Sequence, residues 1–220
     1  MHLNAAEPAY SKTVPLKDNS AAYERKLVGL GFVDVRTLDS TIRVELKYGG
    51  TDNFMKADVY GGLKKCYLRR PAAEILAAAN AYLKQKYPHL RILVADGFRP
   101  RRVQRKMWNL VKNTAMQNYV ANPKWGSMHN YGCAVDVTIA DTNGIRLDMG
   151  CPIDHFGPLS QPRLEKKYLQ SGRLTKQQVA NRHILRDAMT QAGFLPLAIE
   201  WWHFNAFDKK AVRKRYDIVE

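Results

Sequence analysis

The stretch Ser127–Asp136, which reads SMHNYGCAVD, joins a turn to a strand and carries two potential metal ligands. His129 and Asp136 would lie ~23 Å apart on a straight strand and ~10 Å apart along a helix. Metal-bound nitrogen and oxygen atoms lie only ~2.0–2.2 Å from a zinc ion, so neither straight element brings both residues to one ion. The turn-forming run Asn130-Tyr131-Gly132 therefore predicts a bend between His129 and the apolar strand that contains Asp136.

A second segment, Glu200-Trp201-Trp202-His203, supplies another imidazole and another carboxylate in apolar surroundings. Two imidazoles and one carboxylate can hold a metal and leave one coordination position free, as in zinc hydrolases. On a regular strand Glu200 and His203 point to opposite faces, because their separation is odd. If both serve one site, we expect a bulge, a strong twist or a strand end between them.

Each of these residues has an ordinary structural interpretation when it is taken alone. A lone histidine on a strand is more often a hydrogen-bonded core residue, and an aspartate before a β-branched run is commonly a turn or cap residue. The joint pattern of His129, Asp136, Glu200 and His203 is much harder to explain in that way, and it favours a site with one zinc ion per chain. The other histidines have no such setting and are expected to be structural or solvated: His2, His89, His155 and His183.

Length and composition indicate one soluble globular domain. The chain has 220 residues, of which 45% are hydrophobic and 25% charged, and these values are ordinary for such a domain. It contains no run of ~18 apolar residues, so no membrane span is expected. The three cysteines include no Cys-x-x-Cys pair, which argues against a thiolate zinc cluster. We expect Cys133 to be a small packed residue.

The net charge of +15 raises the affinity for polyanions in general, including nucleic acid, anionic lipid and acidic cell-wall polymers. The basic residues are dispersed, and no aromatic-interleaved RNA motif or zinc-finger spacing occurs, so no specific nucleic-acid partner is expected. The cluster within residues 209–215 is predicted to be a solvated helical end. The start Met1-His2-Leu3-Asn4 lacks the basic residues and apolar core of a signal peptide. The compartment stays open between the periplasm, after removal of a signal, and the cytoplasm.

Periodicity and capping signals predict a single α+β domain over residues 21–220, preceded by an extended arm over residues 1–20. Helices are expected over Pro71–Tyr87, from Pro100 onwards with Val103, Met107, Leu110 and Val111 inward, and over Thr175–Ala192 behind a Thr175–Gln178 capping box. Strands are expected over Arg43–Tyr48, Leu90–Ala95, Val135–Ile139 and Phe194–Phe204. This order predicts helices packed on a mostly antiparallel sheet that carries a mononuclear zinc site.

The motif Ser127-x-His129-x-x-Gly132-x-Ala134-x-Asp136, followed by Glu200-x-x-His203, resembles the zinc D-alanyl-D-alanine dipeptidases of the vancomycin-resistance type. The resemblance covers about residues 40–205 and shares its zinc motif with cell-wall carboxypeptidases and endopeptidases of the same fold. Met128 and Cys133 depart from the family pattern. Further matching segments are Lys47-Tyr48 with Asp52-Asn53-Phe54, Asp96-Gly97-Phe98-Arg99-Pro100, Met149-Gly150 with Asp154, and Trp201-Trp202.

The resemblance implies a role for each matching residue. It implies that His129, Asp136 and His203 bind zinc and that Glu200 is the general base, which passes a proton from the attacking water to the leaving amine. It implies that Arg99 stabilises the oxyanion on the scissile carbonyl. Substrate contacts are implied for three further residues: Ser127 and Tyr48 position the substrate, and Asp154 contacts its free ammonium group.

Three functions are weighed on this basis. The leading hypothesis is zinc-dependent hydrolysis of the dipeptide D-Ala-D-Ala to two D-alanines. The nearest alternative is a zinc DD- or LD-carboxypeptidase acting on peptidoglycan stem peptides, and an alternative of another class is a polyanion-binding module with a structural metal. Oligomeric state stays open, as does the choice among antibiotic resistance, wall recycling and nutrient use.

Overall fold

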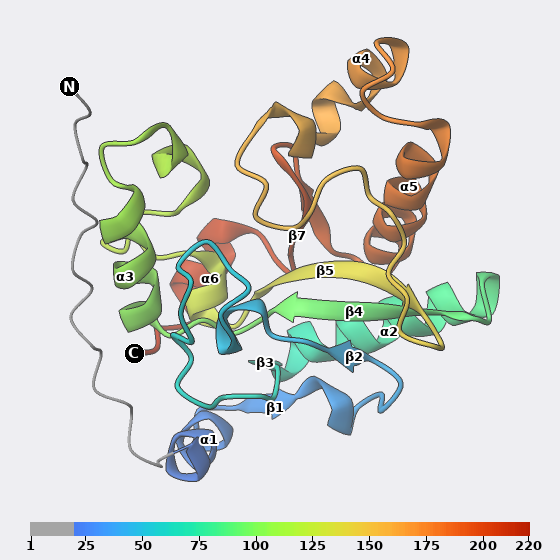
Figure 1. Cartoon of the computed structure of the whole chain (residues 1–220). Coiled ribbons are helices and arrows are strands. Elements are labelled where there is room, and N and C mark those ends of the chain that lie inside the picture. Colours follow the sequence, from blue (N-terminus) through green and yellow to red (C-terminus); the bar gives the residue numbers. More distant parts are fainter. Residues whose placement is uncertain (1–19) are drawn as a thin grey trace, which may run out of the picture.

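The computed structural model describes residues 20–220 (Figure 1). Of the predicted arm over residues 1–20, all but Ser20 lie outside the described residues, and Ser20 begins the first helix. The helices are α1 (Ser20–Gly29), α2 (Arg70–Lys86), α3 (Arg101–Val111), α4 (Glu165–Gln170), α5 (Lys176–Gln191) and α6 (Lys209–Arg215). The strands are β1 (Phe32–Asp34), β2 (Arg43–Val44), β3 (Tyr67–Arg69), β4 (Leu90–Asp96), β5 (Ala134–Asp141), β6 (Leu195–Leu197) and β7 (Glu200–Asn205).

The central sheet has five strands in the order β2-β4-β5-β7-β6. The short edge strand β2 runs parallel to β4, and every other pair in this sheet is antiparallel. A separate antiparallel pair, β1 and β3, lies beside the main sheet. The structure therefore confirms the predicted α+β fold with a mostly antiparallel sheet.

Two helices cover one face of this sheet and leave the other face for the site. Val135 and Val137 of β5 and Phe204 of β7 belong to a buried core shared with side chains of α2 and α5. Because side chains alternate along a strand, Asp136 and His203 project from the opposite face. In β5 the apolar residues Val135 and Val137 alternate with the polar residues Asp136 and Thr138. The apolar side chains therefore face the helices and the polar ones face the site.

Several predicted elements are confirmed closely. Helix α2 and strands β4 and β5 occupy the expected ranges within a few residues. Helix α5 begins behind the predicted capping box: the Gln178 backbone N–H donates to Thr175 Oγ1 at 3.1 Å, and the Thr175 N–H donates to Gln178 Oε1 at 2.8 Å. Gly193 follows the helix at φ +107°, a conformation that suits glycine as a helix stop.

Two predicted strands are wrong in extent. Only Arg43–Val44 forms strand within the predicted Arg43–Tyr48, and Lys47–Gly49 is a 3-10 turn that lets Tyr48 bury its ring. The predicted strand Phe194–Phe204 is a hairpin of β6 and β7, joined by a turn at residues 198–199. Sequence alternation does not distinguish a long strand from two strands with a two-residue turn when the turn residues are apolar.

The expected inward side of α3 is wrong at one position. Val103, Met107 and Val111 are buried as predicted, but Leu110 is 37% exposed. The buried side extends instead to Gln104, whose side chain donates to the Ala121 carbonyl at 2.8 Å and accepts from Arg99 at 3.0 Å. This polar anchor turns the helix so that Leu110 stands at the edge of the buried stripe.

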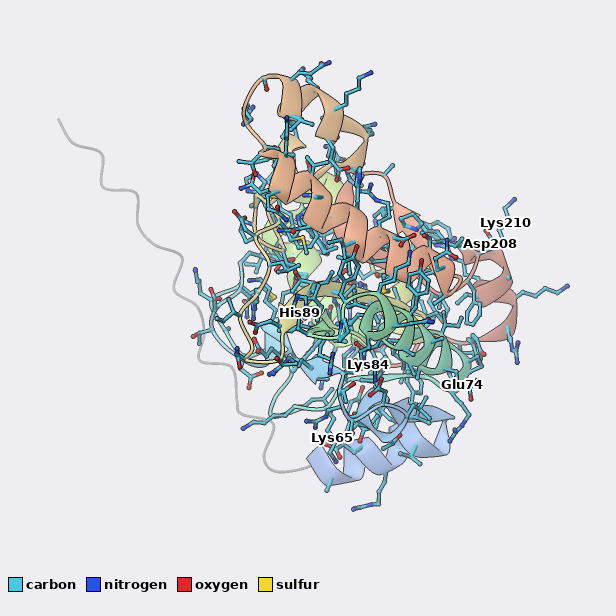
Figure 2. The ribbon with its side chains drawn as sticks, turned by 90° about the vertical axis from the view of Figure 1, so that its right-hand side faces the viewer. Lys65, Glu74, Lys84, His89, Asp208 and Lys210 are labelled. Carbon is cyan, nitrogen blue, oxygen red and sulfur yellow. The ribbon has the colours of Figure 1, made fainter. Side chains whose placement is uncertain are left out.

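The basic C-terminal segment forms α6, as predicted for a solvated helical end. Asp208 caps the helix, because its carboxylate accepts from the backbone N–H groups of Lys210 and Ala211. The basic side chains of α6 are exposed, Lys210 among them (Figure 2), whereas Val212 is buried. Within residues 20–220, no helix has the length and apolarity needed to cross a membrane.

Candidate active site

Three predicted metal ligands converge on the open face of the sheet. One potential ligand atom from each of His129, Asp136 and His203 lies within 4.8 Å of the others. Asp136 Oδ1 lies 3.4 Å from His129 Nε2 and 3.0 Å from His203 Nδ1. Asp136 and His203 are direct partners in the ladder between β5 and β7, so the sheet register itself brings them together.

His129 reaches this group through the predicted bend. Residues Met128–Tyr131 form a 3-10 turn whose capping box joins Ser127 to Asn130. Gly132 then adopts φ +70°, and a Cβ atom there would meet the Phe32 ring at 2.2 Å. Only glycine combines that dihedral angle with so close a neighbour, so the turn returns the chain into β5 directly after His129.

The outer nitrogens of both imidazoles bind carbonyl oxygens. His129 Nδ1 lies 2.7 Å from the Gly97 carbonyl oxygen, and His203 Nε2 lies 3.0 Å from Asn205 Oδ1. A carbonyl oxygen only accepts hydrogen bonds, so these outer nitrogens carry the protons. His129 Nε2 and His203 Nδ1 then present lone pairs 3.2 Å apart.

These two lone pairs and the Asp136 carboxylate are three acceptors that face one another in a buried space. Such a group is satisfied by a proton on one of the imidazoles or by a metal ion placed between the three side chains, and two imidazoles with one carboxylate are a common donor set for catalytic zinc. Burial opposes ionisation of Asp136, but His129 and His203 prevail and hold its pKa well below the usual value. The residues therefore fit a divalent metal ion.

Asp96 is a buried carboxylate that sequence reasoning did not assign to the site. Its Oδ2 accepts from Arg99 Nε at 3.0 Å and Nη2 at 2.5 Å, and its Oδ1 accepts from the Gly97 backbone N–H at 2.9 Å. Asp96 thus holds the guanidinium and the backbone N–H of Gly97, the residue whose carbonyl oxygen binds His129. A carboxylate at the end of an apolar strand is costly without partners, and this was the available signal.

Arg99 lines the site beside Asp136. Its Nη2 lies 3.6 Å from Asp136 Oδ2, and its guanidinium lies 5.1 Å from the centre of the Tyr48 ring. Burial works against its charge, but Asp96 prevails and raises the pKa of Arg99 well above the ordinary value. The guanidinium is therefore a fixed positive charge at the edge of the metal group.

Glu200 stands at the first residue of β7, before an irregularity in the strand. Leu197 pairs with Glu200, but Pro196 pairs with Phe204, so the ladder skips residues between them. This confirms the predicted distortion and lets the Glu200 Oε2 atom lie 4.0 Å from His203 Nδ1. Burial, with a contribution from Asp136, raises the pKa of Glu200 to about 7.

Asp154 and Tyr48 form a second polar pair at the site. The Tyr48 hydroxyl lies 3.0 Å from each carboxylate oxygen of Asp154 and donates its proton to them. Asp154 has φ +67°, a left-handed conformation that aspartate tolerates better than most residues. Burial, assisted by the charge of Asp136, raises the pKa of Asp154 to about 6.

One cavity of about 380 Å³ joins these groups, except that Asp96 is not among its lining residues. It is lined by every residue that the sequence proposed for the site: Tyr48, Arg99, Ser127, His129, Asp136, Asp154, Glu200 and His203. Further aromatic residues line it, among them Phe54, Tyr119 and Phe156 from loops and turns. Sequence reasoning missed them as site residues, because aromatic side chains in loops carry no periodic signal.

The remaining cysteine and histidine predictions agree with the structure where it describes them. Cys133 is fully buried and free, and burial raises the pKa of its thiol to about 12. His89 and His183 are exposed, and His155 is partly buried. His2 lies outside the described residues.

A buried His-Asp-His group, an adjacent carboxylate and a fixed guanidinium in one cavity define a metal-dependent hydrolase. The Peptidase_M15 family, described as D-ala-D-ala dipeptidase, matches residues 29–219. The chain therefore belongs to this family of metallopeptidases, which confirms the resemblance seen in the sequence motifs.

Individual relatives agree with this membership. The D-alanyl-D-alanine dipeptidase of Escherichia coli K12 is 29% identical over 79% of this chain and 83% of its own length. The protein of the same name from Enterococcus faecium is 26% identical over 86% of this chain and 97% of its own length. The D-alanyl-D-alanine dipeptidase of Streptomyces coelicolor is 28% identical over 79% of this chain and 90% of its own length.

Proposed function

We propose that this protein hydrolyses D-Ala-D-Ala to two D-alanines at a single zinc ion held by His129, Asp136 and His203. The observation that carries the proposal is the one cavity that joins this metal group to a general-base candidate and to a carboxylate for a free amine. When bound, zinc supplies Lewis acidity, which polarises a carbonyl group and lowers the pKa of water to near neutrality.

Two side chains perform the proton transfer and charge stabilisation in this proposal. Glu200 accepts a proton from the attacking water and delivers it to the leaving amine, and its pKa of about 7 suits both directions of transfer near neutral pH. Arg99, held by Asp96 and Gln104, directs a fixed positive charge at the oxyanion that forms on the scissile carbonyl. Such stabilisation is typically worth ~3–4 kcal/mol.

The substrate ends are recognised by the remaining polar groups. Asp154 pairs with the free ammonium of the dipeptide, while Tyr48 fixes the orientation of that carboxylate. Ser127 helps to position the substrate from the turn before His129. An acylated or longer peptide has no ammonium there and would leave Asp154 unpaired, which typically costs ~1–3 kcal/mol or more for a charged group.

The decisive experiment compares the zinc-loaded enzyme on D-Ala-D-Ala and on N-acetyl-D-Ala-D-Ala. We expect the free dipeptide to be cleaved with a kcat/KM at least ~10²-fold higher, and treatment with a chelator to abolish cleavage. Absence of activity on D-Ala-D-Ala in the metal-loaded protein would reject the proposed reaction. Equal cleavage of both substrates would instead favour a DD- or LD-carboxypeptidase acting on stem peptides.

A larger cavity adjoins the catalytic one and favours a carboxypeptidase as the second candidate function. The candidate of another class, a polyanion-binding module with a structural metal, is favoured only by the charge of +15. It predicts that Glu200→Gln leaves function unchanged, whereas the peptidase proposals predict loss of turnover.

A further inference from the structure

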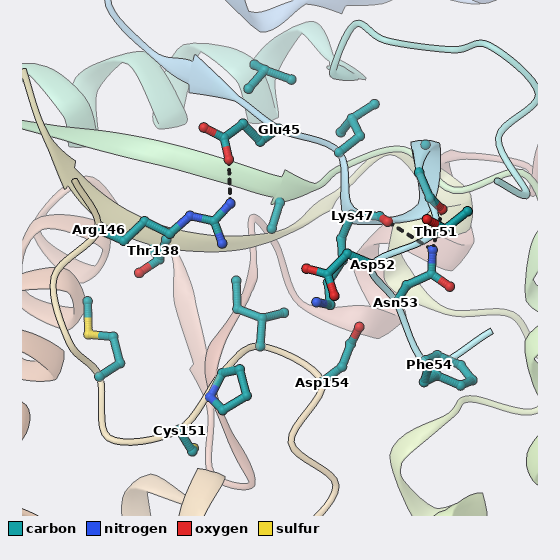
Figure 3. Close-up of a pocket in the computed structure, with 18 of the residues that line it drawn as sticks. Glu45, Lys47, Thr51, Asp52, Asn53, Phe54, Thr138, Arg146, Cys151 and Asp154 are labelled. Atoms are coloured by element: carbon teal, nitrogen blue, oxygen red, sulfur yellow. Dashed lines mark hydrogen bonds and ion pairs between the residues drawn. The ribbon is translucent and has the colours of Figure 1, made fainter. Parts of the chain in front are cut away.

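Figure 3 shows a second cavity, of about 1190 Å³. It adjoins the catalytic cavity, because the two have lining residues in common. Its lining comes mainly from two loop segments, residues 44–56 and 146–154. Among the described residues that line the two cavities, Phe54 and Asp154 are common to both. These two side chains therefore stand between the metal group and the larger space.

We propose that Phe54, with Asp154, forms the wall that ends the catalytic cavity at the amino end of the substrate. Phe54 is then a specificity-determining residue that excludes N-extended peptides, and the larger cavity is the space that an extension would enter. The inference rests on the proposed dipeptidase function and assigns part of its selectivity to one aromatic side chain.

Phe54 is held by other rings that line the catalytic cavity. Its ring centroid lies 6.1 Å from that of Tyr48 and 5.1 Å from that of Phe156, both in edge-to-face geometry. Tyr119 extends the group, with its ring centroid 5.5 Å from that of Phe156. Edge-to-face pairs contribute ~0.5–1.5 kcal/mol each beyond area burial, so the ring has a preferred position rather than free rotation into solvent.

The loop that carries Phe54 is held in place by the buried side chain of Asn53, which is 3% exposed. The Asn53 amide nitrogen lies 3.0 Å from the Lys47 carbonyl, 2.7 Å from that of Gly50 and 3.1 Å from that of Ala57. Its side-chain oxygen accepts from the Met55 backbone N–H at 2.9 Å. One buried side chain thus closes the loop on itself, and Phe54 is attached to a rigid support.

Asp154 completes the wall from the loop of residues 146–154. Tyr48 contacts both halves of the wall, because its hydroxyl donates to Asp154 and its ring packs against Phe54. The two halves exclude an extension for different reasons. Phe54 blocks it by volume, whereas Asp154 disfavours any peptide that lacks the ammonium group. Polar side chains of both charge signs line the larger cavity, including Lys47, Asp52 and Arg146, as suits a peptide backbone with polar substituents.

The test measures kcat/KM of the zinc-loaded enzyme for D-Ala-D-Ala, N-acetyl-D-Ala-D-Ala and the tripeptide L-Lys-D-Ala-D-Ala. Phe54→Ala should raise the ratio of extended to free substrate by tenfold or more, the range expected for changes of pocket volume. Phe54→Leu should raise it less. Tyr82→Ala is the aromatic control. Tyr82 lines neither cavity, and its hydroxyl donates to Asp187, so this change should leave the ratio unchanged.

Combining Phe54→Ala with Asp154→Asn should raise the ratio further, since the volume block and the unpaired charge are removed separately. If the ratios for Phe54→Ala and Phe54→Leu equal those of wild type and Tyr82→Ala, Phe54 does not form the wall. Should Phe54→Ala fail to fold, as judged by circular dichroism and zinc content, Phe54→Leu decides by the same comparison. If the wild-type enzyme is inactive on D-Ala-D-Ala, the proposed function is rejected. If it is active but the ratio does not change in the Phe54 variants, only the wall is rejected.

Discussion

Asp136 on β5 and His203 on β7 are direct partners across an antiparallel ladder, with 3.0 Å between Oδ1 and Nδ1. Asp96 on β4 pairs with Asp136 from the other side, after a bulge in that ladder. Three neighbouring strands thus deliver one row of polar side chains to a single face. Backbone register thus fixes Asp136 and His203, and the turn at Met128–Tyr131 adds His129 to them.

Replacement of Glu200 by glutamine should keep the metal and remove the proton acceptor. We expect kcat to fall by ~10²–10⁴-fold, the usual contribution of general acid–base catalysis, with zinc content by atomic absorption unchanged. Glu24→Gln is the control, because Glu24 forms a surface pair with Lys65 and lies outside the cavity. Turnover retained in Glu200→Gln would remove this residue from the reaction.

Asn205→Ala should weaken metal binding without touching the ion. The change removes the acceptor that holds His203 Nε2 and leaves that imidazole free to rotate. Loss of such an outer partner typically lowers metal affinity ~10–100-fold, which a competitive chelator titration measures. Asn118→Ala, at the same cavity but without a contact to a predicted ligand, should bind zinc as wild type does. Equal affinities in the two variants would contradict this role for Asn205.

Gly132→Ala should destabilise the fold more than Gly193→Ala. Both glycines have positive φ, +70° and +107°, which costs an alanine ~1–2 kcal/mol. At Gly132 the new methyl group also meets the Phe32 ring, whereas nothing lies within 4 Å at Gly193. Overpacking adds ~1–3 kcal/mol, so urea unfolding should separate the two variants by that amount. Similar free energies of unfolding would show that the Phe32 ring moves aside freely.

Asp154→Asn should stabilise the metal-free protein at pH 8. The folded-state pKa of about 6 exceeds the unfolded value of 3.8, so the folded protein binds the proton more tightly. Wild type therefore loses stability as pH rises from about 4 to 6, whereas asparagine has no proton to lose. At ~1.4 kcal/mol per pKa unit, the variant should gain about 3 kcal/mol at pH 8 and little at pH 3.5.

Asp39→Asn should change the free energy of unfolding in the opposite direction to Asp154→Asn in the same urea experiment. Burial opposes ionisation of Asp39, but Thr41, Lys84 and Asn80 prevail through hydrogen bonds and lower its pKa. Its contribution to stability is present at neutral pH and is lost in acid as the carboxylate gains a proton. Asp39→Asn should therefore be less stable than wild type at pH 8. If both variants shift in the same direction, the pKa argument for Asp154 is wrong.

The residues proposed from the sequence lie together in the structure because each belongs to a short motif. The bend at Gly132 and the distortion after Glu200 follow from the reach of side chains and the period of a strand, and both are present in the structure. The cavity brings the eight proposed residues together without exception. Local geometry was sufficient to predict both features, because the bend and the distortion each lie within the motif that carries the site residues.

Features that depend on distant neighbours were not accessible in this way. Tyr48 leaves the strand pattern because its hydroxyl binds Asp154 and its ring packs in a buried cluster with residues such as Phe98 and Met107, and these partners are far away in sequence. Leu110 is exposed because Gln104 finds partners outside its own helix. The importance of Phe54 is visible only when the two cavities that share it are compared.

The strand register that sets the metal group has a consequence for how this enzyme changes over generations. Asp136 and His203 belong to central strands, whose amides exchange with solvent only in large opening events. Phe54 and Asp154 belong to loops, where insertions and substitutions are better tolerated. Drift in those loops can therefore alter which peptides are accepted while the hydrolytic centre is inherited intact.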